Sequence, residues 1–154
     1  MQGVYALIIE VPKKVETTVG ALGTVKFARG IWIYIGSALG TTSTSLEKRI
    51  ARHLSNKKKI HWHIDYLLTN DVKILDAIWA ETKNKEECNL TRRLKKSRDF
   101  ESGPLGFGAS DCSSHCGTHI FRYRANEEIR TKLKSIFTDA SLIGRSLDNL
   151  ISEE

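Results

Sequence analysis

The sequence predicts a small α/β domain of the α+β type, with a mostly antiparallel central sheet flanked by helices. Two segments, 3–11 and 30–36, are rich in β-branched, leucine and aromatic residues and predict strong strands. The connection between them is short and contains glycines, which favours an antiparallel pair because parallel strands need a longer crossover. Segments with helix-start signals follow, so helices are expected against the sheet.

Shorter segments lie between the first strand and the first helix. Residues 13–23 are predicted to be a turn region, and residues 24–27 a short strand. Residues 37–44 form a loop of small side chains, and the T-S-L-E sequence that begins at residue 44 has the form of a capping box. A helix is therefore expected from there to about residue 55. Its predicted apolar stripe has helical spacing: Leu46, Ile50 and Leu54.

The second half of the chain alternates between predicted strands and helices. Residues 61–68, with the sequence HWHIDYLL, fit either a helix or an extended segment. Residues 72–81 predict a third strand, and a second capping sequence at residue 84 predicts a helix to about residue 96. Three elements are expected after a glycine-rich loop at 98–112: a strand at 118–124 and helices at 125–137 and 141–151.

Length and composition indicate one domain over residues 1–154, with a core at about 3–124 and C-terminal helices at about 125–152. Lys and Arg number 24 against 18 Asp and Glu, so the formal charge is +6. This excess suggests an anionic partner, most often nucleic acid, although a basic protein without such a partner is the alternative.

Neither a leader nor a membrane span is expected. The first apolar run has no basic start and is much shorter than the roughly 20 residues that cross a bilayer. Three cysteines, an odd number, suit reduced thiols or a metal site better than a disulfide framework. A cytoplasmic protein is therefore expected.

Two tyrosines occupy the strong predicted strands. If segments 3–11 and 30–36 pair as neighbours, Tyr5 and Tyr34 share a face within hydrogen-bond reach. A tyrosine, with a pKa near 10, needs a nearby cation or metal to act as a base, and the alternative is that both rings only pack in the core. Strand alternation places Ile33 on the opposite side from Tyr34.

Helical spacing places three further polar residues beside apolar stripes. Arg49 and His53, at i and i+4, project from one side of their helix. Arg49 either clamps a phosphate with its planar fork or lies along the helix surface. The Glu87 carboxylate points along the apolar face of the next helix, where it either binds a metal or closes the capping box that begins three residues earlier.

Residues 111–119, DCSSHCGTH, concentrate cysteine and histidine, and Cys88 lies upstream. These are the residue types of a zinc site. Paired C-x-x-C sequences are absent, however, and the C-x3-C and H-x3-H spacings overlap. Structural zinc is therefore the less favoured interpretation, and thiols that are buried or exposed in a loop are the favoured one.

Together these residues resemble the GIY-YIG nuclease superfamily. GVY at 3–5 is similar to its first motif and YIG at 34–36 to its second, while Arg49, His53 and Glu87 match its later functional positions. A closer resemblance is to an uncharacterised, mainly archaeal branch of that superfamily. The matching sequences are HWHIDYLL at 61–68, Glu-Cys at 87–88, and Ser-Asp-Cys at 110–112 before His-Ile-Phe at 119–121. The resemblance covers about residues 3–123.

The resemblance implies a GIY-YIG-like fold and a metal-dependent endonuclease that hydrolyses DNA phosphodiester bonds in repair or recombination. Glu87 would hold one Mg²⁺ or Mn²⁺. Tyr5, acidified by neighbouring positive charge, would activate water, and Tyr34 would orient Tyr5 or the phosphate. Arg49 would neutralise charge on the phosphate, and His53 would support or relay the proton.

Other residues are expected around that site. Many superfamily members also carry an asparagine there, and this chain has Asp111 or Ser110 as the nearest candidates. The candidates for additional site groups are His61, His63, Asp111 and His119. The candidates for binding the DNA backbone are Lys57, Lys58, Lys59, Arg92 and Lys95. Two alternatives remain: a catalytically inactive nucleic-acid-binding module of the same fold, and a structural domain that holds zinc.

Overall fold

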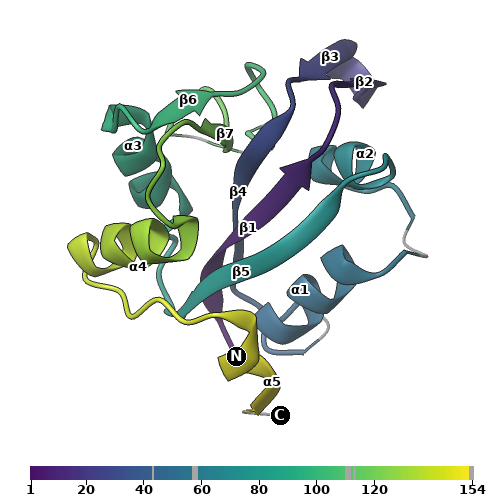
Figure 1. Ribbon diagram of the computed structural model, residues 1–154. Coiled ribbons are helices and arrows are strands. Elements are labelled where there is room, and N and C mark those ends of the chain that lie inside the picture. Colours follow the sequence, from purple (N-terminus) through teal and green to yellow (C-terminus); the bar gives the residue numbers. More distant parts are fainter. Residues whose placement is uncertain (43, 57–58, 110–111, 113, 153–154) are drawn as a thin grey trace.

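The computed structural model describes residues 1–152 except 43, 57–58, 110–111 and 113 (Figure 1). The α+β prediction is confirmed: helices flank a five-stranded antiparallel sheet, and a small two-stranded sheet lies at one end of it. Within the described residues, no helix has the length and apolar character needed to cross a membrane.

The central sheet is built around the two strong strands predicted from the sequence. Its strands are, in spatial order, β5 (Lys73–Glu81), β1 (Gly3–Val11), β4 (Gly30–Ala38), β7 (Ile120–Tyr123) and β6 (Phe100–Ser102). β1 and β4 pair antiparallel over their full length, with Leu7 opposite Tyr34 and Tyr5 opposite Gly36. The predicted pairing of these two strands is therefore confirmed.

In the residues that the structure describes, five α-helices flank this sheet. They are α1 (Leu46–Leu54), α2 (His63–Leu68), α3 (Glu87–Lys96), α4 (Ile129–Asp139) and α5 (Leu147–Ser152). Figure 1 shows α1 and α2 on one side of the sheet and α3 and α4 on the other. Residues of α5 pack with the core on the α1 side.

Strand alternation divides the core into two clusters, one on each side of the sheet. On the α1 side, Tyr5 and Tyr34 pack with Ile50 and Ile64 of the helices. On the α3 side, the cluster is mostly aliphatic. Its aliphatic members are Val4, Ala6, Ile8, Ile33, Ile35, Ile78, Ala80, Leu90, Leu94, Ile129, Leu133 and Ile136, and its aromatic members are Phe100, Phe121 and Phe137. The two tyrosines therefore share a face, and Ile33 lies on the opposite one.

Several local predictions need correction. Residues 13–23 are not only turns, because β2 (Val15–Thr18) pairs there with β3 (Thr24–Phe27) around the 3₁₀ helix η1 (Gly20–Leu22). The predicted loop at 98–112 contains β6, which is only three residues long. The segment at 61–68 is helical from His63 onward, as α2.

Both predicted capping boxes are also placed wrongly. Ser45, not the residue before it, caps α1, and its hydroxyl accepts a hydrogen bond from the Lys48 backbone at 3.4 Å. α3 begins only at Glu87, so this glutamate does not close a box started at residue 84. Leu54 is 45% exposed, and the buried side of α1 ends in His53 instead.

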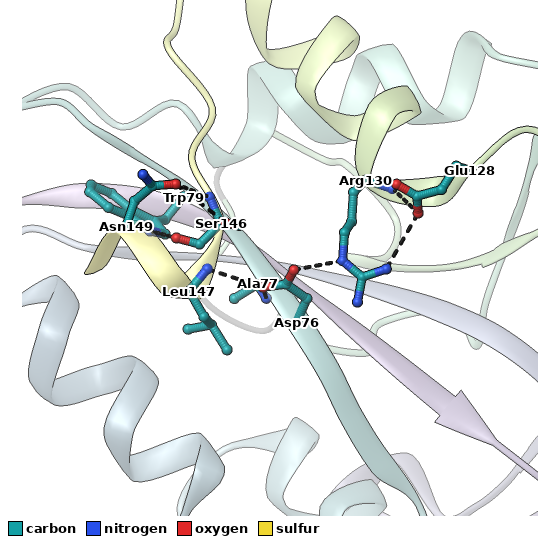
Figure 2. Close-up of polar contacts among 8 residues, drawn as sticks. All are labelled: Asp76, Ala77, Trp79, Glu128, Arg130, Ser146, Leu147 and Asn149. Atoms are coloured by element: carbon teal, nitrogen blue, oxygen red, sulfur yellow. Dashed lines mark hydrogen bonds and ion pairs between the residues drawn. The ribbon is translucent and has the colours of Figure 1, made fainter. Parts of the chain in front are cut away.

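The C-terminal segment, residues 140–152 after α4, is held against β5 by hydrogen bonds (Figure 2). Asp76 accepts from the Leu147 backbone at 3.1 Å and from Nε of Arg130 at 2.7 Å. The Trp79 indole donates to the Ser146 carbonyl at 2.8 Å. These contacts link α4, β5 and the start of α5.

Candidate functional site

A cavity of about 170 Å³ opens where the α1 side of the sheet meets the start of α3. Its lining comes from segments far apart in the sequence. The lining residues are Tyr5, Tyr34, Gly36, Ser37, Arg49, Trp62, Lys85, Glu87, Gly108, Cys112 and His119. Four of the predicted site residues, from β1, β4, α1 and α3, therefore meet at one place.

Tyr5 is held by a hydrogen bond that links the sheet to α1. Its hydroxyl lies 2.7 Å from Nε2 of His53, which is 2% exposed. Gly36, opposite Tyr5 in the register, leaves the space for this hydroxyl, because a Cβ there would lie 2.5 Å from Tyr5 Oη. His53 thus lies behind Tyr5 and is not part of the cavity lining.

Burial governs the acidity of both tyrosines. It raises the pKa of Tyr5 well above its ordinary value, more than the Arg49 guanidinium lowers it. Burial, together with the Glu87 carboxylate, likewise raises the pKa of Tyr34. The expectation that neighbouring positive charge acidifies Tyr5 is therefore wrong, because the effect of burial on its pKa exceeds that of Arg49. Both hydroxyls are protonated near neutral pH.

Arg49 is fixed at the cavity by two contacts. Its NH1 donates to the Ser37 carbonyl at 2.6 Å, and its guanidinium carbon lies 4.7 Å from the centre of the Trp62 ring. Arg52 lies against the same ring at 4.4 Å. The ring holds Arg49 by cation–π attraction without occupying its other N–H donors.

Trp62 is in turn oriented by Asp65, a fully buried carboxylate at the start of α2. Asp65 accepts two hydrogen bonds from Arg52, each 3.0 Å long, and one from the Trp62 backbone at 2.9 Å. Burial raises its pKa, but these bonds outweigh burial, so the pKa of Asp65 falls below its ordinary value. The pair of Arg52 and Asp65 was not predicted from the sequence.

Glu87, the first residue of α3, is partly exposed toward the cavity. Its Oε1 accepts a hydrogen bond from Ser37 Oγ at 3.2 Å, and its Oε2 lies 3.8 Å from Nδ1 of His119. One carboxylate beside an open cavity fits a Mg²⁺ or Mn²⁺ ion, which usually takes one or two protein carboxylates and completes its shell with water and substrate oxygens.

A second group of possible ligands lies beside Glu87. Cys88, Cys112, Cys116 and His119 each offer one ligand atom, and these atoms lie within 4.8 Å of one another. Burial raises the pKa of the Cys112 thiol, but hydrogen bonds from Cys116 and Cys88 outweigh it and hold that pKa below its ordinary value. This cluster could hold a metal ion. The interpretation of the cysteines as metal-free thiols missed this arrangement.

The remaining predicted site residues do not all reach the cavity. His119 does, but His61 is exposed and meets the Trp62 ring edge to face. His63 accepts a hydrogen bond from the Gly108 backbone at 2.9 Å and so holds the loop. The basic residues Lys59, Arg92 and Lys95 are exposed. Lys57, Lys58, Ser110 and Asp111 lie outside the described residues.

Four lining residues were not predicted from the sequence as site residues: Ser37, Trp62, Lys85 and Gly108. Trp62 and Ser37 carry no signal beyond their neighbours, and Lys85 is one of many lysines. Only their contacts single them out: Trp62 through Arg49, and Ser37 through both Arg49 and Glu87.

Comparison with known proteins gives one result. No curated protein and no solved structure matches the chain. A family model does match, over residues 4–142, which span the central sheet, α1 to α4 and the cavity. The chain therefore belongs to the family described as Domain of unknown function DUF123.

Proposed function

We propose that this protein is a metal-dependent endonuclease of the GIY-YIG type, which hydrolyses DNA phosphodiester bonds. One observation carries the proposal: Tyr5, Tyr34, Arg49 and Glu87, on four different elements, line a single cavity. Phosphodiester hydrolysis needs a proton acceptor for water, a cation for the phosphate and a metal ligand. These side chains can supply all three.

The hydrogen bond between Tyr5 and His53 supports proton transfer from water. Tyr5 is protonated at rest, so its hydroxyl cannot take a proton unless it gives one away. Nε2 of a neutral His53, 2.7 Å from the hydroxyl, can accept that proton as Tyr5 takes one from the attacking water. In this scheme Tyr34, on the same face, orients the Tyr5 ring or the phosphate.

Arg49 would bind the scissile phosphate. Its contacts with Ser37 and Trp62 fix the guanidinium before substrate arrives, so no ordering is needed as negative charge grows on the phosphate oxygens. Glu87 would hold the divalent cation. When bound, that cation supplies charge stabilisation for a phosphate oxygen and the leaving group.

The charge of the chain supports DNA as the partner. The formal charge is +6, and Lys85 at the cavity rim is exposed, as are Lys59, Arg92 and Lys95. Such lysines and arginines bind the sugar–phosphate backbone without reading sequence, which suits an enzyme that recognises branched or damaged DNA in repair or recombination. A cytoplasmic location fits this role.

The test is cleavage of linear, flapped, branched and damaged DNA in the presence of Mg²⁺ or Mn²⁺. The wild-type protein should cleave at least one of these substrates, and Glu87→Gln and Arg49→Ala should each lose at least about 100-fold in rate. Glu86→Gln and Arg93→Ala are the matched controls, because Glu86 is the N-cap residue of α3, Arg93 lies on α3, and neither lines the cavity.

Two outcomes would contradict the proposal. Equal cleavage by wild type, Glu87→Gln and Arg49→Ala would move the activity to another site or to a contaminant. Salt-sensitive DNA binding without cleavage under either cation would instead establish a nucleic-acid-binding module of the same fold.

A further inference from the structure

The Cys and His cluster has the spacing of a site for one ion. A tetrahedral zinc with Zn–S bonds of about 2.3 Å separates its ligand atoms by roughly 3.8 Å. In the structure the Sγ atoms of Cys88 and Cys112 lie 3.4 Å apart, and no two of the four ligand atoms are separated by more than 4.8 Å. An iron–sulfur cluster, with ligands on several iron atoms, would need wider spacing.

His119 gives an independent indication of a ligand. Its side chain is 3% exposed, and within the described part of the chain neither ring nitrogen has a hydrogen-bond partner. A buried polar group without a partner costs about 1–3 kcal/mol, so such groups are rare in folded proteins. A metal ion bound by one ring nitrogen would remove that cost for that nitrogen.

The chemistry of the donors selects the metal. Three thiolates and an imidazole form the Cys₃His set of structural zinc sites, whereas Mg²⁺ and Mn²⁺ prefer oxygen ligands. A disulfide between Cys88 and Cys112 would explain neither the buried Cys116 thiol nor the orientation of His119. Zinc explains all four side chains at once.

We propose that Cys88, Cys112, Cys116 and His119 bind one Zn²⁺ in a closed tetrahedral site, separate from the divalent-cation position at Glu87. Because all four ligands come from the protein, the ion is structural and leaves no open position for substrate. It ties the first turn of α3 to the loop that precedes β7.

A zinc ion at this site would also fix part of the cavity lining. Glu87 is adjacent to Cys88 in the first turn of α3, and its carboxylate lies 3.8 Å from the His119 ring. Cys112 and His119 themselves line the cavity. The zinc therefore fixes the wall that presents Glu87. Two other lining residues, Tyr5 and Arg49, come from β1 and α1, which contribute none of the four ligands.

The first experiment measures bound metal in protein purified under reducing conditions. About one zinc per chain is expected by elemental analysis, and Co²⁺ exchanged into the site should show the sulfur-to-cobalt charge-transfer band of a thiolate site. Cys116→Ser and His119→Ala should each lose more than about tenfold in zinc affinity. His115→Ala is the matched control, since His115 is exposed in the same loop.

Two results would contradict the zinc proposal. Protein without zinc that gives no charge-transfer band with Co²⁺ would overturn the proposal. Zinc retained by His119→Ala and lost by His115→Ala would overturn the ligand assignment. Neither result depends on DNA or on cleavage, so failure of the nuclease proposal and failure of the zinc proposal are distinguishable.

A second measurement uses only the wild-type chain, in case a ligand variant does not fold. The chain has three cysteines, all in the proposed site. Stepwise modification of the thiols with an organomercurial should release zinc to a chromogenic chelator in proportion to the thiols consumed. Consumption of all three thiols without zinc release, in protein that carries zinc, would place the metal elsewhere.

Discussion

The two sides of the central sheet are both buried, yet they bury different chemistry. The buried side chains of the α3 side are mostly aliphatic and phenyl. Its buried polar residues are Thr91 of α3 and Asp76, which pairs with Arg130 of α4. The α1 side also buries Tyr5, Tyr34, His53 and Asp65, and the cavity opens there. We infer that the two sides have different roles. Packing on the α3 side mainly stabilises the fold, whereas the α1 side buries polar side chains at a cost in stability, where the proposed chemistry takes place.

Two of the buried polar side chains of the α1 side, Tyr5 and Asp65, have polar partners. Tyr5 has His53, and Asp65 has Arg52 together with backbone N–H groups. Pairing lowers the cost of burial, and it also fixes each side chain in one orientation. The comparison therefore predicts that substitutions on the two sides affect different measurements.

The largest effect on stability is expected from Phe137→Ala on the α3 side. Phe137 is fully buried, so its loss should lower the free energy of unfolding by about 3–5 kcal/mol. DNA cleavage per folded molecule should stay near the wild-type rate. Urea unfolding followed by circular dichroism measures the first quantity. Leu105→Ala, at a residue that is 82% exposed, is the control and should change stability by less than about 0.5 kcal/mol.

Tyr5→Phe should have the opposite profile. Removing the hydroxyl should cost about 1–2 kcal/mol of stability, since His53 Nε2 loses the hydrogen bond to Tyr5. The proposed cleavage should fall by at least about 100-fold because the route from water to His53 is broken. Tyr123→Phe, whose hydroxyl donates to the Glu127 carbonyl away from the cavity, should cleave normally. Similar cleavage rates for Tyr5→Phe and wild type would refute the proposed functional role of the α1 side.

Asp65→Asn should lower stability by about 2 kcal/mol near neutral pH, because charge-assisted hydrogen bonds to Arg52 are lost. The pKa of Asp65 is lower in the folded protein than the roughly 3.9 of an unfolded chain. Its stabilising contribution is therefore present above that value and is lost as pH falls through the folded pKa. The gap between wild type and variant should narrow in acid unfolding below about pH 4, and a gap independent of pH would contradict this account.

The smallest effect is expected from Arg130→Gln on the outer surface of the α3 side. Arg130 pairs with Asp76 at 2.7 Å, but its side chain is 40% exposed and the pair is screened by solvent. Stability should fall by about 0.5 kcal/mol, less so at high salt. Thermal unfolding at two salt concentrations would measure it. A loss above about 2 kcal/mol would show that this side relies on its charged rim as well as on packing.

The site residues that lie within regular strands and helices could be predicted from the sequence. Alternation along 3–11 and 30–36 was enough to place Tyr5 and Tyr34 on one face, because both strands have a regular period of two. Helical spacing likewise placed Arg49 and His53 together. These are local regularities, and the structure follows them.

The metal cluster and the Asp65 pair depend on tertiary contacts. Cys88 is on α3 and meets Cys112 only because the loop before β7 folds back, so no sequence spacing reveals the set. Arg52 on α1 and Asp65 on α2 are 13 residues apart and meet only in the folded chain. β6 was missed because three residues are too few for a pattern.

The C-terminal segment has a bearing on self-association. β5 is an edge strand of the sheet, and an open edge offers unpaired N–H and C=O groups to a strand from another molecule. Trp79 and Arg145 exchange backbone hydrogen bonds of 2.8 Å in both directions across that edge. The segment after α4 thus occupies the edge of β5 at Trp79, and a strand from a second copy cannot pair with β5 at that position while the bridge is intact.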